Sequence, residues 1–228
     1  KVLQTSIGNI DYDYLVLAAG TTSNFFGNKQ IEEAAMPMKT LSEAMGLRNA
    51  LLSNLERSVT CDTTQERREL LNVVIVGGGA TGVEIAGAIA EMKRYILPKD
   101  YPEIDHSDLH IFLIEAGNRL LSGMSVKSSR KAEEFLRRMG VNIYLNKRVT
   151  DFVAHKVILE DGMEIPTQTF IWVSGVRANE IGNLSSDAVG HGGRSAGRDD
   201  PGLPQHRVPD RGPARCRSRS PPNARGTP

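Results

Sequence analysis

The chain has 228 residues, which is enough for one or two domains with a hydrophobic core. Its formal net charge of +1 gives no electrostatic reason to expect a nucleic-acid partner. Cys61 and Cys216 form no CxxC pair, which excludes a dithiol or zinc centre built from them and favours a reduced, intracellular protein. No apolar run approaches the roughly 20 residues that cross a bilayer. Because the chain begins without Met, we interpret it as part of a longer protein.

Residues 2–19 predict two strands, and the second, Tyr14–Ala19, is apolar enough to lie inside a sheet. This strand ends at Gly20, followed by two threonines. Small residues at such an exit let a loop lie close to a bulky ligand, although an ordinary strand end explains the pattern equally well.

A helix is predicted to begin after Thr40, because residues 40–43 read Thr-Leu-Ser-Glu, a capping box. We interpret the apolar stripe of this helix as core packing rather than a partner surface. The stripe consists of Leu41, Ala44, Met45, Leu51, Leu52 and Leu55. A short helix near residues 65–71 leads into the next strand.

The most informative stretch is NVVIVGGGATGVEIAGAIA, residues 72–90. An apolar strand runs into a glycine turn and then into a helix from Thr81 through Glu91, which is the setting of a dinucleotide fingerprint. Gly77 permits the tight turn, Gly79 lets the backbone approach a pyrophosphate, and Gly82 lets the helix pack against the sheet. The free N–H groups at the start of the helix then face the phosphates.

Two carboxylates are candidate ligand contacts. Glu84 is placed on the first turn of this helix, either as a charge favoured at a helix N-terminus or as a group facing a cofactor. After a polar insertion at residues 95–108, an apolar strand ends at Glu115. An acid at the tip of the second strand suits ribose hydroxyls and repels a 2′-phosphate, which favours NADH over NADPH. Arg119, close by, weakens that preference.

The rest of the pattern completes an α/β fold. A helix at residues 125–139 is expected to turn Ala132, Phe135, Leu136 and Met139 inward and to stop at Gly140, before a third strand at 141–145. Strand, helix, strand, helix and strand in this order predict a parallel sheet. Short strands at 149–153, 156–160 and 163–165 predict a three-stranded meander, with His155 on the surface. A last strand, 170–174, should return beside the glycine turn and bring Gly175 towards a nicotinamide.

Several stretches together resemble one family: YDYLVLAAGTTSNFFGN, AMPMKTLSEAMGLRNALL, VVIVGGGATGVEIAGAIAEM, HIFLIEAGNRLL and TFIWVSGVRAN. They are similar to flavoprotein oxidoreductases with two dinucleotide-binding domains, and within these to type II NADH:quinone oxidoreductases. The resemblance covers roughly residues 1–190. It implies an NADH-binding domain of Rossmann type, with a parallel sheet and a meander, inserted in a fragment of an FAD-binding domain.

The resemblance also assigns roles. Gly77, Gly79, Ala80, Thr81 and Gly82 match the pyrophosphate turn, Glu115 the ribose ligand and Glu84 the acid beside the nicotinamide. Ala19, Gly20 and Gly175 match backbone positions near the flavin and nicotinamide. The implied chemistry is hydride transfer from NADH to FAD, followed by electron transfer to a membrane quinone. The complete protein would lie on the cytoplasmic face of the membrane, and a homodimer is one assembly open to it.

The resemblance divides the chain into a partial FAD-domain segment at 1–30, an NADH domain at 31–180 and a tail at 181–228. The chain departs from the family in lacking the first flavin fingerprint, a strand ending in Gly-Asp near the C-terminus, and C-terminal amphipathic helices. Two other functions stay open: an NAD(P)H-dependent reductase of a disulfide or small redox protein, and a non-catalytic NADH sensor.

The composition changes near residue 186, and the segment after His191 is built largely from Arg, Pro, Gly, Ser and Asp. A disordered native tail and an Arg-rich nucleic-acid arm are two interpretations, and the second lacks interleaved aromatic residues. Our hypothesis is an out-of-frame translation from about Ser195. Reading the encoding DNA in the other frames for an apolar run ending in Gly-Asp tests it.

Overall fold

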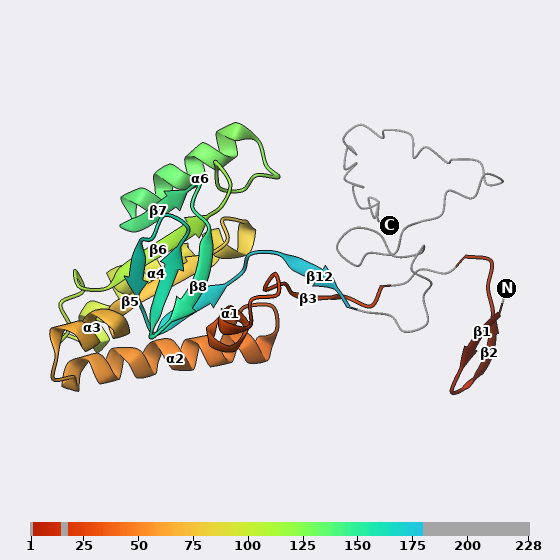
Figure 1. Cartoon of the computed structure of the whole chain (residues 1–228), viewed down its shortest axis with the longest axis horizontal. Helices are drawn as coiled ribbons and strands as arrows, with labels where there is room; N and C mark the ends of the chain where they lie inside the picture. Colours follow the sequence, from red (N-terminus) through yellow and green to blue (C-terminus); the bar gives the residue numbers. More distant parts are fainter. Residues whose placement is uncertain (1, 15–17, 180–228) are drawn as a thin grey trace, which may run out of the picture.

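The computed structural model describes residues 2–14 and 18–179. Figure 1 shows an α/β unit from which a two-stranded ribbon extends towards an N-terminal hairpin. The expectations for the tail at 181–228 lie outside the described residues.

The centre of the fold is a five-stranded parallel sheet in the order β4-β11-β5-β6-β7. The strands are β4 (Met36–Pro37), β11 (Thr169–Trp172), β5 (Asn72–Val76), β6 (His110–Glu115) and β7 (Val141–Leu145). Every residue of β5 and β11 is buried, as expected for strands covered on both faces. The predicted parallel sheet, and the return of the last strand beside β5, are confirmed.

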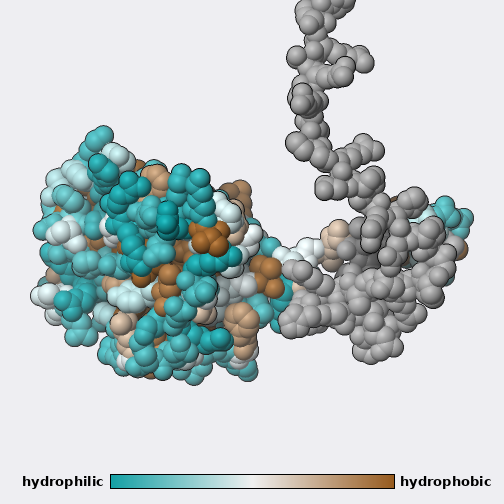
Figure 2. Space-filling view, turned by 90° about the horizontal axis from the view of Figure 1, so that it is seen from above, coloured by the Kyte–Doolittle hydropathy of each residue, from teal (hydrophilic) through white to brown (hydrophobic). Residues whose placement is uncertain are grey.

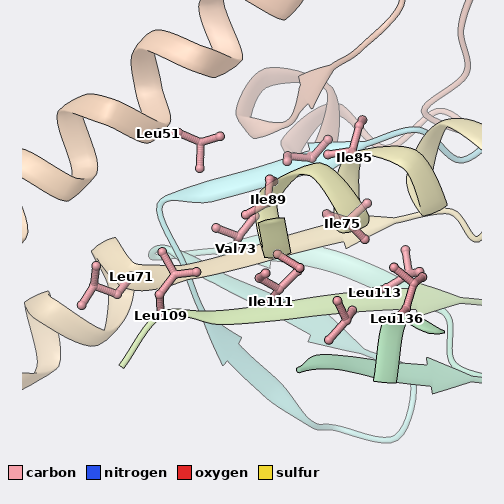
Figure 3. Close-up of a cluster of buried hydrophobic side chains, with 14 of the residues drawn as sticks. Leu51, Leu71, Val73, Ile75, Ile85, Ile89, Leu109, Ile111, Leu113 and Leu136 are labelled. Carbon is pink, nitrogen blue, oxygen red and sulfur yellow. The ribbon is translucent and has the colours of Figure 1, made fainter. Parts of the chain in front are cut away.

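Helices cover one face of this sheet. They are α2 (Leu41–Thr60), α3 (Thr64–Leu71), α4 (Ala80–Tyr95), α5 (Leu97–Asp100) and α6 (Val126–Arg138). Alternate strand residues point to this face, so Val73 and Ile75 pack with Ile85 and Ile89 of α4 in one buried cluster. Figure 3 shows α4 lying over β5, with its isoleucines directed at the strand.

The predicted meander covers the other face. It consists of β8 (Val149–Val153), β9 (Lys156–Leu159) and β10 (Glu164–Pro166), paired antiparallel. Together with α1 (Lys29–Ala34) it encloses a second buried cluster that contains Val74, Val76 and Trp172. His155 is exposed, as the sequence predicts. The carboxyl edge of the sheet therefore lies between a helical layer and a layer of strands.

Local sequence signals set the helix ends. The side chain of Thr40 accepts a hydrogen bond from the Glu43 N–H, and Glu43 accepts one from the Thr40 N–H, which completes the predicted capping box. Ser125 caps α6 in a similar way. Gly140 has φ +86° directly after α6, consistent with its predicted role as the stop.

Two predicted apolar faces are partly wrong. On α2, Leu51 and Leu55 are buried, whereas Leu41, Met45 and Leu52 are exposed. The helix is rotated so that Leu47, Leu51, Asn54, Leu55 and Ser58 form its inner face. On α6, Leu136 is buried but Phe135 is exposed and lies beneath the guanidinium of Arg138, 4.3 Å from its ring centroid. Buried serine and asparagine, which apolar counting overlooks, mark the true inner faces.

The predicted buried strand Tyr14–Ala19 is not supported by its described part. Tyr14 is exposed, and Ala18 and Ala19 are exposed residues without regular secondary structure. Residues 15–17 lie outside the described residues. A strand is buried only where other strands and a covering layer surround it, and the sequence pattern does not supply these neighbours.

The insertion at 95–108 is not merely polar. It contains α5, and it buries Leu97 and Ile104 against the main cluster. These two buried side chains anchor the insertion to the core near the end of α4. A purely polar surface loop would have no such anchors.

Two small sheets lie outside the α/β unit. Strands β1 (Val2–Thr5) and β2 (Gly8–Asp11) form the hairpin, while β3 (Thr21–Ser23) and β12 (Val176–Ala178) form the ribbon. In the described ranges, no helix has the length and apolarity needed to cross a membrane. Figure 2 accordingly shows a largely hydrophilic face on the α/β unit, with hydrophobic residues in small groups.

Candidate functional site

The turn between β5 and α4 is closely surrounded by backbone at two of its glycines and by buried side chains at a third. A Cβ on Gly77, which has φ +117°, would lie 2.8 Å from the Val173 carbonyl. A Cβ on Gly82 would lie 1.9 Å from the Gly77 carbonyl oxygen, and one on Gly78 would lie 2.6 Å from the Leu120 side chain. No side chain fits at any of the three positions without a shift of its neighbours. The tight backbone turn seen here therefore requires glycine at each of them.

Gly79 differs from these three. A Cβ there would meet nothing within 4 Å, its φ is an ordinary −72°, and the residue is exposed. Gly79 is the N-cap of α4 and no side chain caps the helix there. Ala80 and Thr81 follow as exposed residues of the first turn. The opening of α4 therefore presents backbone N–H groups to an uncovered surface, which is where helices bind phosphate.

Glu115 lies directly beside this turn. One oxygen of its carboxylate accepts a hydrogen bond of 2.6 Å from the Gly78 N–H, and the other accepts one of 2.6 Å from the Gly117 N–H. A carboxylate has about four acceptor positions, so these two bonds fix its orientation and leave capacity for further donors. The structure thus joins the strand tip and the glycine turn, as the sequence predicts, and holds the acid in place.

Arg119 is directed elsewhere. Its guanidinium donates to the carbonyl oxygens of Met124 (3.0 Å) and Ser122 (2.5 Å). The side chain is therefore engaged by its own loop. In the sequence, Arg119 weakened the predicted preference for NADH over NADPH. A guanidinium held in this way must break two hydrogen bonds to reach a 2′-phosphate, so this argument against the preference is weaker in the structure.

Glu84 is on α4 but not on its first turn. The helix begins at Ala80 and has no acidic residue in its first turn, which places Glu84 one turn further along. The sequence prediction of a first-turn position is wrong, and a helix-dipole role is weaker at this distance. The Glu84 side chain is exposed, so it is accessible to a ligand lying over the start of α4.

The ribbon gathers the remaining predicted contacts. Asn179 donates from its side chain to the Ala19 carbonyl at 2.8 Å and from its backbone to the Gly20 carbonyl at 3.1 Å. At the opposite end, Gly175, with φ +89°, accepts from the Asn24 N–H at 3.3 Å. Gly20 and Gly175 therefore belong to one exposed ribbon but lie at its two ends, separated by the three residue pairs of β3 and β12.

A cavity of about 610 Å³ opens at the carboxyl edge of the sheet, on the face that the meander covers. The ends of the strands and the residues just after them contribute Val76, Ile114, Ala116, Trp172 and Ser174, while the opposite wall comes from α1, β8 and the loops before them. The residues of that wall are Phe25, Phe26, Asn28, Ile31, Lys147, Arg148, Val149 and Thr150. Its size lies within the range of small-molecule sites, and Ala116 joins its rim to Glu115.

Sequence reasoning missed three residues of the site. Gly78, the middle glycine, gives its N–H to Glu115, and its carbonyl accepts from the Leu121 N–H at 2.8 Å. Leu120 packs over it. The run of three glycines was a usable signal for Gly78, since the fingerprint itself requires only the outer two. No local pattern marks Leu120 or Leu121, because they reach the turn only through tertiary packing.

The residues at the carboxyl edge fit a dinucleotide. An open cradle at Gly79, an uncapped helix start and a fixed carboxylate at the neighbouring strand tip supply donors for a diphosphate and an acceptor for sugar hydroxyls. Fold and site together indicate a nucleotide-binding α/β protein whose parallel sheet carries a helical layer on one face and a β-meander on the other.

Comparison with known proteins refines this class. The family model described as "Pyridine nucleotide-disulphide oxidoreductase" matches residues 2–195. The chain belongs to this family.

Individual relatives point in the same direction. The chain is 33% identical over 175 residues to the type II NADH:quinone oxidoreductase Ndh of Mycobacterium tuberculosis, and the match covers 75% of this chain and 38% of that protein. It is 35% identical to the internal alternative NAD(P)H-ubiquinone oxidoreductase A1 of Solanum tuberosum, over 74% of this chain and 34% of that one. The chain thus spans little more than a third of the length of these relatives.

Among solved structures, NDH2 from Plasmodium falciparum in complex with NADH superposes with a TM-score of 0.69 at 26% identity. The superposition covers 75% of this chain and 36% of that one. The predicted fold class is confirmed by this similarity and by the parallel sheet.

Proposed function

We propose that this chain forms the NADH-binding part of a flavoprotein that passes hydride from NADH to FAD and then electrons to a quinone. The observation that carries the proposal is the contact between Glu115 and the glycine turn, which builds a diphosphate cradle and a sugar acceptor side by side. The family and the names of the relatives favour this chemistry over other uses of a dinucleotide fold.

In the proposed complex the pyrophosphate lies on the N–H groups of Gly79, Ala80 and Thr81, with Gly77 and Gly82 shaping the turn beneath it. The adenosine ribose donates its hydroxyls to Glu115. Since Ala116 follows Glu115 and lines the cavity, an adenine attached to that ribose reaches the cavity rim. The carboxylate disfavours a 2′-phosphate by like-charge repulsion, so NADH is preferred over NADPH.

The nicotinamide end is proposed to lie towards Glu84 and the ribbon. Glu84 accepts a hydrogen bond from the carboxamide, while the exposed backbone at Gly175, Gly20 and Ala19 borders the flavin. Bound FAD supplies the two-electron chemistry of such a protein, and this chain positions the hydride donor against it.

The division into an FAD-domain segment at 1–30 and an NADH domain at 31–180 remains part of the proposal, as do the membrane quinone and the location on the cytoplasmic membrane face. Each of these concerns the complete protein, of which the chain spans about a third to two fifths in its relatives.

The first test is nucleotide binding by the chain with Glu115→Ala. We expect NADH affinity to fall by about tenfold or more, because an acceptor for two hydroxyls is lost, and the preference for NADH over NADPH to narrow. Isothermal titration with both nucleotides measures this. Glu91→Ala, an exposed carboxylate further along α4, is the matched control and should bind as the unaltered chain does. Unchanged affinity for both nucleotides in Glu115→Ala would contradict the assignment of Glu115 as the acceptor of the ribose hydroxyls.

The second test concerns Glu84. In the complete flavin-loaded protein, Glu84→Gln should slow flavin reduction by NADH more than it weakens NADH binding, with Glu91→Gln as the control. Stopped-flow absorbance of the flavin resolves the two effects. If Glu84→Gln and the unaltered protein reduce the flavin at equal rates, Glu84 is only a solvated surface charge.

The alternative functions make different predictions for the complete protein. A sensor would purify without flavin and fail to oxidise NADH with a quinone, whereas a reductase of a disulfide or small redox protein would carry flavin but reduce quinone poorly. Flavin absorbance and quinone-dependent NADH oxidation separate all three.

A further inference from the structure

The amino edge of the sheet, opposite the proposed nucleotide site, carries two adjoining hollows. They lie where α3 runs into β5 and where β6 begins, at the end of the α/β unit remote from the β3–β12 ribbon (Figure 1). The smaller hollow, of about 120 Å³, is lined by Thr64, Arg67, Arg68, Leu71, Asp108 and His110. The larger hollow, of about 480 Å³, is lined by Thr64, Gln65, Arg68, Lys156, Glu164 and Pro166. Because Thr64 and Arg68 line both, the two hollows are neighbours along α3.

Two arginines of α3 reach the smaller hollow without a partner. Arg67 is half-buried and Arg68 is exposed. Within residues 2–14 and 18–179, neither guanidinium takes part in a side-chain hydrogen bond or an ion pair, whereas Arg57 on the adjacent helix is held by Glu66 and Gln168. A guanidinium carries five N–H donors, so the two arginines leave strong donor capacity for a ligand in this hollow.

The acidic residues that line the hollows do not balance these charges. Glu164, in the larger hollow, is paired with Lys156 at 2.8 Å. Asp108 is the acid that lines the smaller hollow, and its charge also acts on Lys93 of α4. The smaller hollow therefore sets two guanidinium groups and an imidazole against one shared carboxylate. A pocket with an excess of positive charge favours an anionic ligand.

The environment of His110 shows the same imbalance. Burial lowers the pKa of this imidazole from 6.5, Lys93 lowers it further, Asp108 raises it, and Arg68 lowers it again. The neighbouring strand β5 places the uncharged Asn72 beside His110. Cations thus outweigh the anion around the imidazole. A bound anion would stabilise the protonated form and raise the pKa of His110.

We propose that the smaller hollow binds the phosphate group of a phosphomonoester and that the larger hollow takes its alcohol part. The planar fork of a guanidinium matches two phosphate oxygens, and two arginines can hold one phosphate from different sides. Thr64 offers a hydroxyl and His110 a further N–H donor to the same group. A phosphate presents three terminal oxygens, so it satisfies donors from several directions better than a planar carboxylate does. This inference is independent of the proposed redox function.

Titration of the 228-residue chain with inorganic phosphate and with glycerol 3-phosphate, followed by amide NMR, tests the location. At low salt and about pH 6 we expect saturable shifts at residues 64–71 and 108–110, with a dissociation constant on the order of 1 mM for inorganic phosphate. Glycerol 3-phosphate should bind about threefold tighter, because it also fills the larger hollow. The proposed nucleotide cradle at 77–82 is followed by its own amides. Shifts confined to 77–82 would overturn the proposal, and equal affinities would overturn the role of the larger hollow.

Charge variants test the residues in both directions. Arg67→Ala and Arg68→Ala should each weaken binding of inorganic phosphate by at least about fivefold, because each removes a charged donor. Asp108→Asn removes the opposing charge and should strengthen binding by about threefold. Arg48→Ala, at an exposed arginine of α2 outside both hollows, is the matched control and should bind as the unaltered chain does. Circular dichroism confirms that the variants fold. Unchanged affinity in both Arg67→Ala and Arg68→Ala would overturn the proposal.

The imidazole of His110 reports directly on a neighbouring anion. Its ring resonances are identified by their loss in His110→Gln, and NMR titration then gives the pKa of His110 with and without phosphate. Saturating inorganic phosphate should raise this pKa by about half a pH unit or more. The pKa of His155, an exposed histidine of the meander, should stay the same and serves as the internal control. An unchanged pKa of His110 at saturation would show that the phosphate is not bound beside it.

Discussion

The β5–α4 turn and the β3–β12 ribbon both carry glycines assigned to cofactor contact, yet they are built in opposite ways. At the turn, Gly77, Gly78 and Gly82 are buried; a Cβ on Gly77 or Gly82 would collide with backbone, and one on Gly78 with the side chains of Leu120 and Glu115. On the ribbon, Gly20 and Gly175 are exposed. The core determines the geometry of the turn, whereas the ribbon is held by three residue pairs and a few terminal hydrogen bonds.

This difference indicates where the protein is preorganised. A diphosphate cradle supported by a parallel sheet and a helix needs no rearrangement to bind its ligand, which lowers the cost of ordering on binding. A two-stranded ribbon is marginally stable by itself and can open locally without unfolding the sheet. The nucleotide end of the proposed site is therefore expected to be rigid and the flavin end adaptable.

The largest expected effect is at Gly82. Gly82→Ala places a Cβ 1.9 Å from the Gly77 carbonyl oxygen, so α4 must move away from the turn. We expect a loss of about 3 kcal/mol or more in the free energy of unfolding. Gly79→Ala is the matched control: its Cβ meets nothing, and the cost should stay below about 1 kcal/mol. Urea unfolding followed by circular dichroism measures both.

The same pair of variants separates stability from binding. Gly79→Ala should still weaken NADH binding, because the methyl group enters the space assigned to the pyrophosphate. If Gly82→Ala proves as stable as Gly79→Ala, the turn is less constrained than its geometry indicates.

A smaller effect is expected on the ribbon. Gly175→Ala introduces a side chain at φ +89° and brings its Cβ to 3.1 Å from the Phe26 ring, a local strain of about 1–2 kcal/mol. Because the ribbon can open alone, we expect faster amide hydrogen exchange at residues 21–23 and 176–178 with little change in the melting temperature. Gly20→Ala, whose Cβ would lie 3.5 Å from Asn179, should increase the amide exchange rate by a smaller amount. A drop in global stability equal to that of Gly82→Ala would show that ribbon and core unfold together.

The smallest expected effect lies at the amino edge of the sheet, away from both regions. Burial lowers the pKa of His110 from its ordinary value of 6.5, and the nearby Lys93 and Arg68 lower it further. The folded chain then binds fewer protons than the unfolded one, so this residue's contribution to stability is present above pH 6.5 and is lost as the pH falls through the lowered pKa.

The contribution of His110 should be well under about 1 kcal/mol, because its side chain is only partly shielded from solvent and screening weakens the charges around it. Urea unfolding at several pH values from about pH 7.5 to about pH 5 measures it. His110→Gln should flatten the profile in this window. An unaltered profile in the variant would assign the pH dependence to other groups.

The order of strands and helices was predictable because the signals for it are local. The capping box at Thr40, the glycine run at 77–79 and the continuous apolar run of β5 each depend on near neighbours in the chain. Faces were harder to predict. Leu41, Met45 and Phe135 are apolar and correctly spaced, yet they point outward, because helix rotation is decided by which neighbours compete for the core.

The amino-acid sequence alone determined the α/β architecture, the position of the glycine turn and the presence of an acid at the next strand tip, because backbone sterics and hydrophobic periodicity act over a few residues. Only the tertiary structure decided that Glu115 is held by Gly78, that Leu120 closes the turn, and that Arg119 is bound by its own loop. These contacts join residues from different elements, and their geometry exists only after the strands have paired and the helices have packed.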